Sequence, residues 1–409
     1  MKRLLTVSAV TLIMLFTAVM STACANLLED YIESISPHIS LPYERPPVEQ
    51  KVISSMEEFE EFLLDLIISH QTETNIQYNN VENEDVQAEI DRISREILEN
   101  HPIAVYAVTE INLTATRIVR YFEIDIEIEF MRTAEQLEAI INAPTARFMM
   151  TSLLEIMSRY DEEAVFRTGL QLTGEDIIEQ IVEIYYQNPR EIVMMPFVTV
   201  EMFPEQGEDR IYVIRFGYTQ SPEMLRLFGE SLDIYVRQNA ERAVGDNQGE
   251  ILLSLVENLM ASTEFDEGTA GTISMHAPQN IAATAFGAFV RGSAVGEGFA
   301  MAFKALCDEL RIECRVVLGF LDEKFHAWNI VALEGYYYHI DVSMSVVLGL
   351  EAAFLKNDGD FEEFYIWDRE NTQICNGPLT LYDIMKVDND TYPENGSGDE
   401  TENITGGED

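Results

Sequence analysis

A histidine and an aspartate in the C-terminal half of the chain have the spacing of a catalytic acid–base pair. His326 opens the run His-Ala-Trp-Asn, and Asp341 closes the run Tyr338-His-Ile-Asp. A two-residue turn at Glu334-Gly335 would join two antiparallel strands and place Asp341 one diagonal step from His326 on the same face. The two backbone positions would then lie roughly 7 to 8 Å apart, a distance that a ring and a carboxylate can bridge. The spacing therefore predicts a His–Asp couple.

A helix is predicted directly before this hairpin, and it begins at a glycine. The segment from Gly292 runs Gly-Ser-Ala-Val-Gly-Glu-Gly and leads into apolar residues at helical spacing, among them Phe299, Phe303 and Leu306. Position 296 would lie at the helix N-terminus, where unpaired amides and the macrodipole lower the pKa of a thiol. A thiol there, beside a His–Asp couple, would attack an amide carbonyl.

These runs together resemble the active-site core of the bacterial transglutaminase-like family, which has a papain-like fold. The family pattern is Cys-Glu-Gly-Tyr-Ala opening a helix, then His-Ala-Trp-Asn and Tyr-x-x-Asp on paired strands, and this chain has Gly296 at the cysteine position. The resemblance covers about residues 250–345 and implies an α+β domain in which the helix packs on an antiparallel sheet. It also implies catalytic roles for His326 and Asp341, with these residues beside them: Glu297, Trp328, Asn329 and Tyr338.

Two departures from the family pattern predict a site without catalysis. Gly296 has no nucleophile, and it leaves a small gap that could admit a ligand or a water. Cys307 is roughly 16 Å further along the helix, and Ser293 precedes the helix in the predicted loop. After its aspartate the family often continues Thr-Trp-Asp, whereas this chain has Val342-Ser-Met-Ser, which predicts a weakened aspartate side. The alternative is an active cysteine-type acyl transferase or peptidase that uses another nucleophile.

The N-terminus has the pattern of an export signal. Lys2 and Arg3 precede an apolar run over residues 4–20, and small residues surround Cys24. Residues 1–24 are predicted to be a signal peptide that ends in a lipoprotein box, with Cys24 lipidated. Ordinary cleavage after Ala25 and an uncleaved anchor are the alternatives. Residues 25–50, which contain four prolines after position 36, would form a semi-extended stalk.

The chain is strongly acidic, with 72 acidic against 26 basic residues and a formal net charge of −46. Such a field disfavours nucleic acid and anionic lipid surfaces as partners. Solubility in a salty or alkaline exterior explains the charge, and a surface for a cationic wall component or metal ions is the alternative. No cofactor is indicated, and the six scattered histidines lack the spacing of a zinc site.

Residues 51–240 are predicted to form an α+β module. Ser55, Thr133 and Ser221 begin capping patterns that precede helical periodicity, and alternating runs over 124–130 and 210–216 predict strands. The similar order of elements suggests two copies of one unit, over about 51–142 and 172–240. The transglutaminase-like domain would follow over 245–386, and the acidic segment 387–409 would be a disordered tail.

Apart from Cys24, three cysteines remain, and an odd number argues against a full disulfide framework. Cys307, Cys314 and Cys375 are predicted to be buried thiols, while a Cys314–Cys375 or Cys307–Cys314 bridge is the alternative. The sequence as a whole predicts an exported, lipid-anchored envelope protein that binds or displays a peptide or wall glycopeptide. A structural spacer without a ligand is the second alternative, and the oligomeric state is left open.

Overall fold

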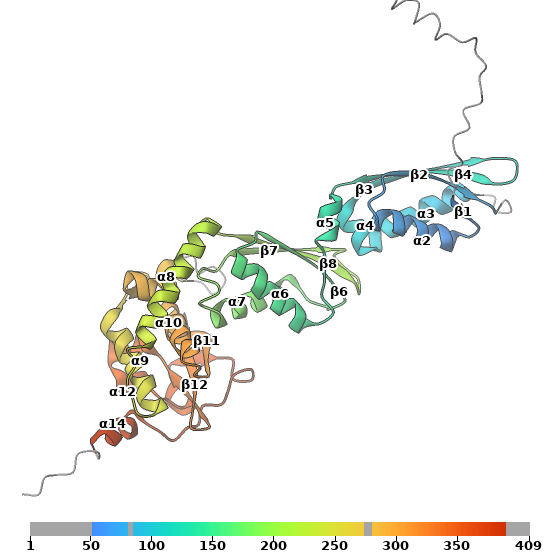
Figure 1. Ribbon diagram of the computed structural model, residues 1–409. Coiled ribbons are helices and arrows are strands. Elements are labelled where there is room, and N and C mark those ends of the chain that lie inside the picture. The colour runs from blue at the N-terminus through green and yellow to red at the C-terminus, as the bar shows by residue number, and fades with distance from the viewer. Residues whose placement is uncertain (1–50, 81–84, 274–279, 390–409) are drawn as a thin grey trace, which may run out of the picture.

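The computed structural model describes residues 51–80, 85–273 and 280–389. The predicted signal, Cys24 and stalk lie outside these residues, as does the predicted tail from residue 390 onward, whereas its first residues, 387–389, belong to a helix, α14 (Leu381–Asn389). Figure 1 shows three lobes in a row, and each combines helices with a β-sheet, as the predicted α+β class requires. Within the described ranges, no helix has the length and apolar character to cross a membrane.

The first lobe is a four-stranded sheet with its helices on one face. The sheet has the order β1-β2-β4-β3, in which β1 and β2 are parallel and the other pairs antiparallel. Along β4, isoleucines point into the core and acidic residues point out, as the alternating sequence predicts. The elements are β1 (Lys51–Ile53), α2 (Met56–Ile68), β2 (Glu73–Tyr78), α3 (Val86–Asn100), α4 (Pro102–Ala107), β3 (Val108–Arg117) and β4 (Phe122–Phe130).

The second lobe follows a short helix, α5 (Ala134–Glu138), and has a sheet with the order β5-β6-β8-β7. β5 and β6 are parallel and the other pairs antiparallel, so order and directions equal those of the first sheet. A short parallel strand opens each unit, so the similar units span 51–130 and 141–217. The predicted second unit began at 172 because sequence periodicity did not reveal β5. Duplication stays a hypothesis. The elements are β5 (Ile141–Asn142), α6 (Ala146–Arg159), β6 (Glu163–Thr168), α7 (Gly174–Gln187), β7 (Phe197–Phe203) and β8 (Arg210–Gly217).

The third lobe carries the residues of the predicted site. Its sheet has the order β13-β12-β11-β14, entirely antiparallel, and α10 packs on β12 and β11. The helices that precede the site are α8 (Pro222–Ala240), α9 (Gln248–Ser262), η1 (Ile281–Ala283), η2 (Gly287–Arg291) and α10 (Gly296–Glu309), with the short strands β9 (Glu264–Phe265) and β10 (Ser293–Ala294). The rest are β11 (Cys314–Leu321), β12 (Lys324–Leu333), β13 (Tyr336–Ile340), α11 (Val342–Leu348), α12 (Leu350–Ala353), α13 (Asp358–Phe361), β14 (Tyr365–Trp367) and α14 (Leu381–Asn389).

The predicted helix starts agree with the structure. The side chain of Ser55 accepts a hydrogen bond from the Glu58 amide, Thr133 forms a capping box, and Ser221 caps α8. One strand ends earlier than predicted: β13 stops at Ile340, so Asp341, which the hairpin prediction places on the strand, lies directly after it. The reason is Asp341, whose side chain caps α11, a position that aspartate favours.

The hydrophobic cores do not follow the predicted boundary at residues 240–245. Tyr185 of α7 belongs to the same buried cluster as Phe299 and Phe303 of α10, so the second and third lobes share one core. Val165 and Val213, on the other face of the second sheet, join the core of the first lobe. The second sheet is therefore covered on both faces, and the lobes are not independent in packing.

Candidate functional site

The β12–β13 hairpin brings His326 and Asp341 together. Leu333 pairs with Tyr336, which is the register that the sequence predicts. His326 Nε2 lies 2.7 Å from Asp341 Oδ2, a hydrogen bond between two buried side chains that are 7% and 1% exposed. The sequence-derived couple is thus present as a geometric pair.

The carboxylate of Asp341 is held by four donors. Oδ1 accepts from the Ser343 hydroxyl at 2.7 Å and from the Met344 amide at 3.0 Å. Oδ2 accepts from His326 and from the Tyr365 hydroxyl at 3.0 Å. The expectation that Val342-Ser-Met-Ser weakens the aspartate side is therefore wrong, because the serine and the amide that follow it are hydrogen-bond donors to the carboxylate.

The two groups stabilise each other's charge. Burial alone would lower the pKa of His326, but the Asp341 carboxylate outweighs burial and leaves the pKa of His326 above its usual value. Burial would likewise raise the pKa of Asp341, but the imidazole and the amide and hydroxyl donors hold that pKa below its usual value. The geometry therefore favours an imidazolium–carboxylate pair below the raised pKa of His326.

Gly296 is the first residue of α10, and the imidazole lies directly against it. A β-carbon at Gly296 would be 2.3 Å from Cε1 and 2.5 Å from Nδ1 of His326. Such contacts are far below the 3.5–4.0 Å of ordinary packing. The expected gap for a ligand or water is therefore absent, because the ring of His326 fills it. Since Nε2 is bonded to Asp341, Nδ1 is the nitrogen that faces the helix N-terminus.

The predicted neighbours are all buried, but they serve different purposes. Glu297 is 3% exposed, and burial raises its pKa. Asn329 donates to the Ala300 carbonyl at 3.0 Å and so joins β12 to α10. Tyr338 accepts from the Leu379 amide at 3.2 Å, which joins β13 to the C-terminal segment. Of these three, only Glu297 adds charge to the site.

A second buried histidine, His339, which sequence reasoning missed, contacts the same tryptophan, Trp328, as His326 does. The Trp328 indole donates to His339 Nδ1 at 3.0 Å, so Nε2 carries the proton and donates to Asp358 at 2.9 Å. Cys375 is the third donor of this group, and the ligand atoms of His339, Asp358 and Cys375 lie within 4.8 Å of one another. The only sequence signal was the proximity of His339 to Asp341, since residues 358 and 375 are distant in the chain.

This second cluster does not fit a metal ion or a catalytic triad. A metal at Nε2 would require the proton on Nδ1, which would face the indole N–H with no acceptor. A cysteine nucleophile needs a free imidazole nitrogen, and both nitrogens of His339 are occupied. Burial and the Asp358 carboxylate also raise the pKa of Cys375. The cluster instead fixes Trp328, whose ring is edge-on to Tyr365 at 5.0 Å between centroids.

The other cysteines offer no substitute nucleophile beside His326. Cys307 and Cys314 are buried free thiols, as predicted, and Cys375 is a third. Burial raises the pKa of Cys307 far above its usual value, which suppresses the reactive thiolate. Cys307 lies on α10 three turns beyond Gly296, and the residue in contact with the imidazole is Gly296 itself.

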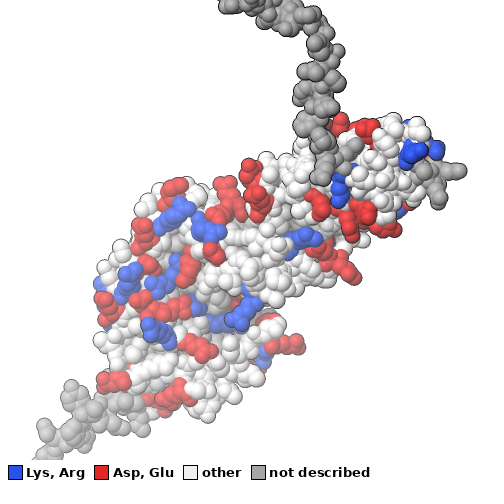
Figure 2. All heavy atoms as spheres, turned by 45° about the vertical axis from the view of Figure 1, so that its right-hand side comes forward, with Lys and Arg blue, Asp and Glu red and all other residues white. Residues whose placement is uncertain are grey.

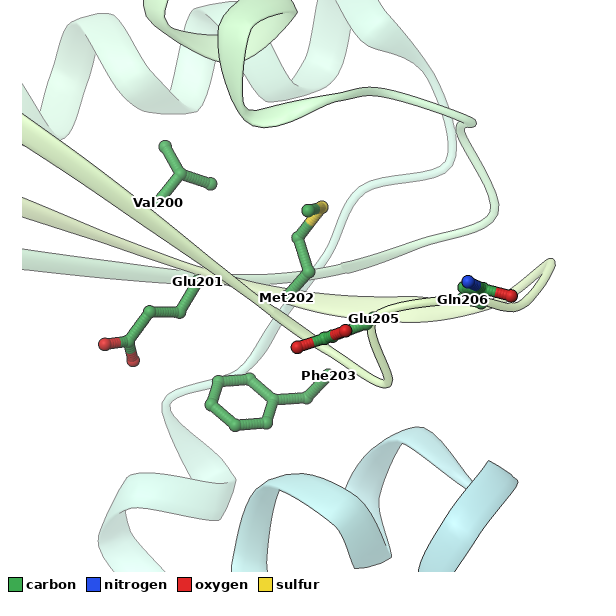
Figure 3. A pocket seen from close by; sticks show the side chains of 6 residues that line it. All are labelled: Val200, Glu201, Met202, Phe203, Glu205 and Gln206. Carbon is green, nitrogen blue, oxygen red and sulfur yellow. The ribbon is translucent and has the colours of Figure 1, made fainter.

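Three surface hollows among the described residues are lined by residues other than Gly296, His326 and Asp341. One of about 500 Å³ lies at the end of β7 and is lined by Val200, Glu201, Met202, Phe203, Glu205 and Gln206 (Figure 3). None of these is a predicted site residue. On the face shown in Figure 2, acidic side chains are scattered and interspersed with lysine and arginine, so they form no single acidic patch on this face.

Comparisons with known proteins leave the family unassigned. Neither a protein-family model nor a curated protein matches the sequence. A crystal structure of a TGase is 12% identical over 53% of this chain and 61% of its own length, with a TM-score of 0.25. A candidate cysteine protease from Cytophaga hutchinsonii is 13% identical over 36% of this chain and 62% of its own, with a TM-score of 0.23. A candidate protease from Parabacteroides distasonis is 6% identical over 66% and 43%, with a TM-score of 0.20. The chain spans less than two thirds of each, and such TM-scores establish no common fold.

Proposed function

We propose that this protein is an exported envelope protein whose transglutaminase-like site does not catalyse and whose surface beside that site binds a ligand. One observation carries the proposal: the imidazole of His326 occupies the space of a nucleophile side chain at Gly296, while its bond to Asp341 is intact. A His–Asp couple can accept and hold a proton, but it cannot attack a carbonyl by itself. The burial of His326 and Asp341 also supports a site closed to a peptide substrate.

An extended peptide is the ligand that the neighbouring surface suits best. Phe320 of β11 pairs with Ile366 of the edge strand β14, one position from the pair Gly319–His326. Phe320, Phe364 and Ile366 are 40%, 53% and 64% exposed, which is high for large apolar side chains. A peptide strand added to β14 would cover these side chains and gain backbone hydrogen bonds. The peptide part of a wall glycopeptide meets the same description.

The absence of acyl-transfer activity is tested by incubating the full chain with glutamine-containing peptides. We expect the wild-type protein to release no ammonia and to form no cross-links, because Gly296, the residue against the His326 ring, has no nucleophilic side chain. Cys375→Ser and Ser293→Ala serve as matched controls, since each removes another candidate nucleophile. Turnover by the wild type that either substitution abolishes would contradict the proposal and favour a working acyl transferase.

Envelope location is tested separately. If Cys24 is the lipidated N-terminus, the protein should partition with membranes, and Cys24→Ser should release or misprocess it. A soluble mature form that begins at Asn26 would show ordinary secretion instead.

Peptide binding is tested by fluorescence titration of the two tryptophans, Trp328 and Trp367, which lie in the cluster that includes β14. Ile366→Glu should abolish the titration, whereas an equal response from that variant would remove the peptide surface.

A further inference from the structure

Helix α7 of the second lobe reaches both elements that meet at the His326 site. β11 and β12 form one side of the site, because Gly319 pairs with His326 and Val316 with Asn329. Helix α10 forms the other side, because it begins at Gly296. Besides its neighbours in the second lobe, α7 contacts β11 and α10, and Arg190 in the turn after α7 reaches Glu309 at the far end of α10.

Gln187, the last residue of α7, takes the place of a neighbouring strand on β11. Its amide nitrogen donates to the Val316 carbonyl at 2.8 Å, and its amide oxygen accepts from the Val316 N–H at 3.1 Å. Strand β14 pairs with β11 only over Gly319–Leu321, so Val316 lies beyond the end of that pairing. One side chain therefore satisfies both backbone groups of a residue that is 1% exposed. One turn earlier on α7, Glu183 adds an ion pair to Arg315 at 2.9 Å.

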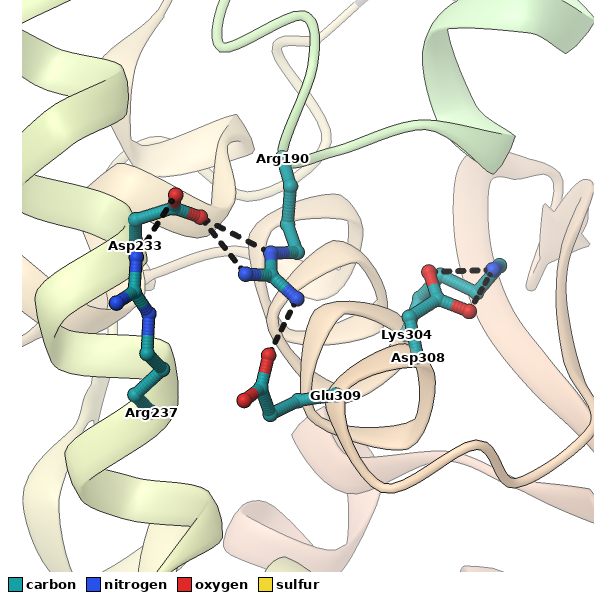
Figure 4. Close-up of polar contacts among 6 residues, drawn as sticks. All are labelled: Arg190, Asp233, Arg237, Lys304, Asp308 and Glu309. Carbon is teal, nitrogen blue, oxygen red and sulfur yellow. Dashed lines mark hydrogen bonds and ion pairs between the residues drawn. The ribbon is translucent and has the colours of Figure 1, made fainter.

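Arg190 fixes the C-terminal end of α10. Figure 4 shows its guanidinium between Asp233 of α8 and Glu309 of α10, with N–O distances of 2.9 Å and 2.6 Å. Arginine suits such a bridge because its planar fork can bond two carboxylates in fixed directions. Glu309 is the last residue of α10, and Gly296 is the first, so this bridge sets where the helix N-terminus points.

We infer that Gln187 and Arg190 are positioning residues for the His326 site. Gln187 holds β11 and Arg190 holds α10. Because the two residues are only three positions apart in the chain, they fix the sheet and the helix relative to each other. The inference rests on the proposed function, since it concerns the same site. It also explains why the second and third lobes share a core. The second lobe is accordingly part of the site's scaffold and not a separate spacer.

The test is the titration of His326 in the full chain. Proton–carbon NMR of the histidine rings follows six signals, and His326→Gln identifies the one that matters. In Gln187→Leu, the packing volume is kept and both hydrogen bonds are lost, so β11 and β12 gain freedom. We expect the titration midpoint of His326 to move back toward its ordinary value. Glu179→Gln, on the exposed face of α7, should leave it unchanged.

A second measurement uses Gly296→Cys as the background. Iodoacetamide should alkylate the introduced thiol, and mass spectrometry of the tryptic peptide 292–304 reports that position alone, because Arg291 and Lys304 flank it. Adding Gln187→Leu or Arg190→Lys should slow this alkylation by about tenfold at neutral pH, since ångström-scale misplacement has large effects on reactivity.

The outcomes separate the inference from the proposed function. A lower urea midpoint of unfolding with an unchanged His326 titration and an unchanged alkylation rate would show that Gln187 and Arg190 only stabilise the fold, and would overturn the inference. An inert thiol in Gly296→Cys alone would count against the proposed site, but the titration of His326 in the Gly296 protein would still decide the role of Gln187.

Discussion

Asp341→Asn should destabilise the third lobe more than any other single acid-to-amide change at the site. The carboxylate is 1% exposed and accepts from His326 and Tyr365 on one oxygen, and from Ser343 and Met344 on the other. Removing one partner of a buried ion pair costs about 3–5 kcal/mol. The amide oxygen can still accept from the serine and the helix amide, so we expect the lower value, about 3 kcal/mol, near pH 5.5.

The loss of unfolding free energy caused by Asp341→Asn should become smaller as pH rises. The pKa of His326 is raised in the folded protein, so its pairing stabilises the fold fully below the unfolded pKa of about 6.5. That contribution is lost as pH rises through the higher folded-state pKa. In Asp341→Asn, burial is opposed only by the Glu297 carboxylate, so the pKa of His326 should fall and the variant lacks the contribution of Asp341. The difference in unfolding free energy should therefore narrow between about pH 5.5 and pH 9.

Urea unfolding followed by tryptophan fluorescence measures this difference. Both tryptophans of the chain, Trp328 and Trp367, lie in the cluster beside the site, so the signal reports on the third lobe. Asp358→Asn is the matched control, because His339 donates to it as a neutral imidazole and burial lowers the pKa of His339. A loss for Asp341→Asn that stays constant with pH, or one as small as that of the control, would refute the ion-pair argument.

Two further predictions concern hydrogen bonds that only the structure reveals. Tyr365→Phe removes one donor to Asp341 and should lower the free energy of unfolding by about 1–2 kcal/mol in urea; an unchanged midpoint would show that this bond contributes nothing. Gln87→Ala uncovers the Leu113 carbonyl and the Ala115 amide on the edge of β3, so sedimentation velocity should reveal concentration-dependent association that the control Gln77→Ala lacks. A variant that stays as monodisperse as the wild type would contradict the protective role of Gln87.

Local patterns predicted much of the third lobe because its signals are short-range. The turn at Glu334-Gly335 fixes the hairpin register, and the register alone brings His326 to Asp341. Capping residues such as Ser55 and Ser221 act within three residues, so their helix starts could be placed correctly. The same reasoning gave the alternation of buried and exposed residues along β4.

What the sequence could not reveal depends on contacts between distant segments. Tyr365 reaches Asp341 from β14, and Gln187 reaches Val316 across 129 positions, so neither is visible in a local pattern. The direction of the His326 ring decided whether Gly296 leaves a gap, and a side-chain rotamer is set by tertiary packing. Strand β5 has only two residues, too few for periodicity to identify it. For this reason the sequence placed the start of the second unit at residue 172 instead of residue 141.

The proposed function requires that the His326–Asp341 couple and the N-terminus of α10 meet at Gly296, a residue without a nucleophilic side chain. The most direct test is the pH dependence of iodoacetamide alkylation at the thiol introduced by Gly296→Cys, with His326→Gln as the comparison. The new β-carbon requires the imidazole to move by about 1 Å, after which Nδ1 can accept the thiol proton. We predict alkylation well below the ordinary thiol pKa of about 8.5, and loss of that advantage in the double variant. A rate that follows an ordinary thiol pKa and is indifferent to His326→Gln would contradict the account.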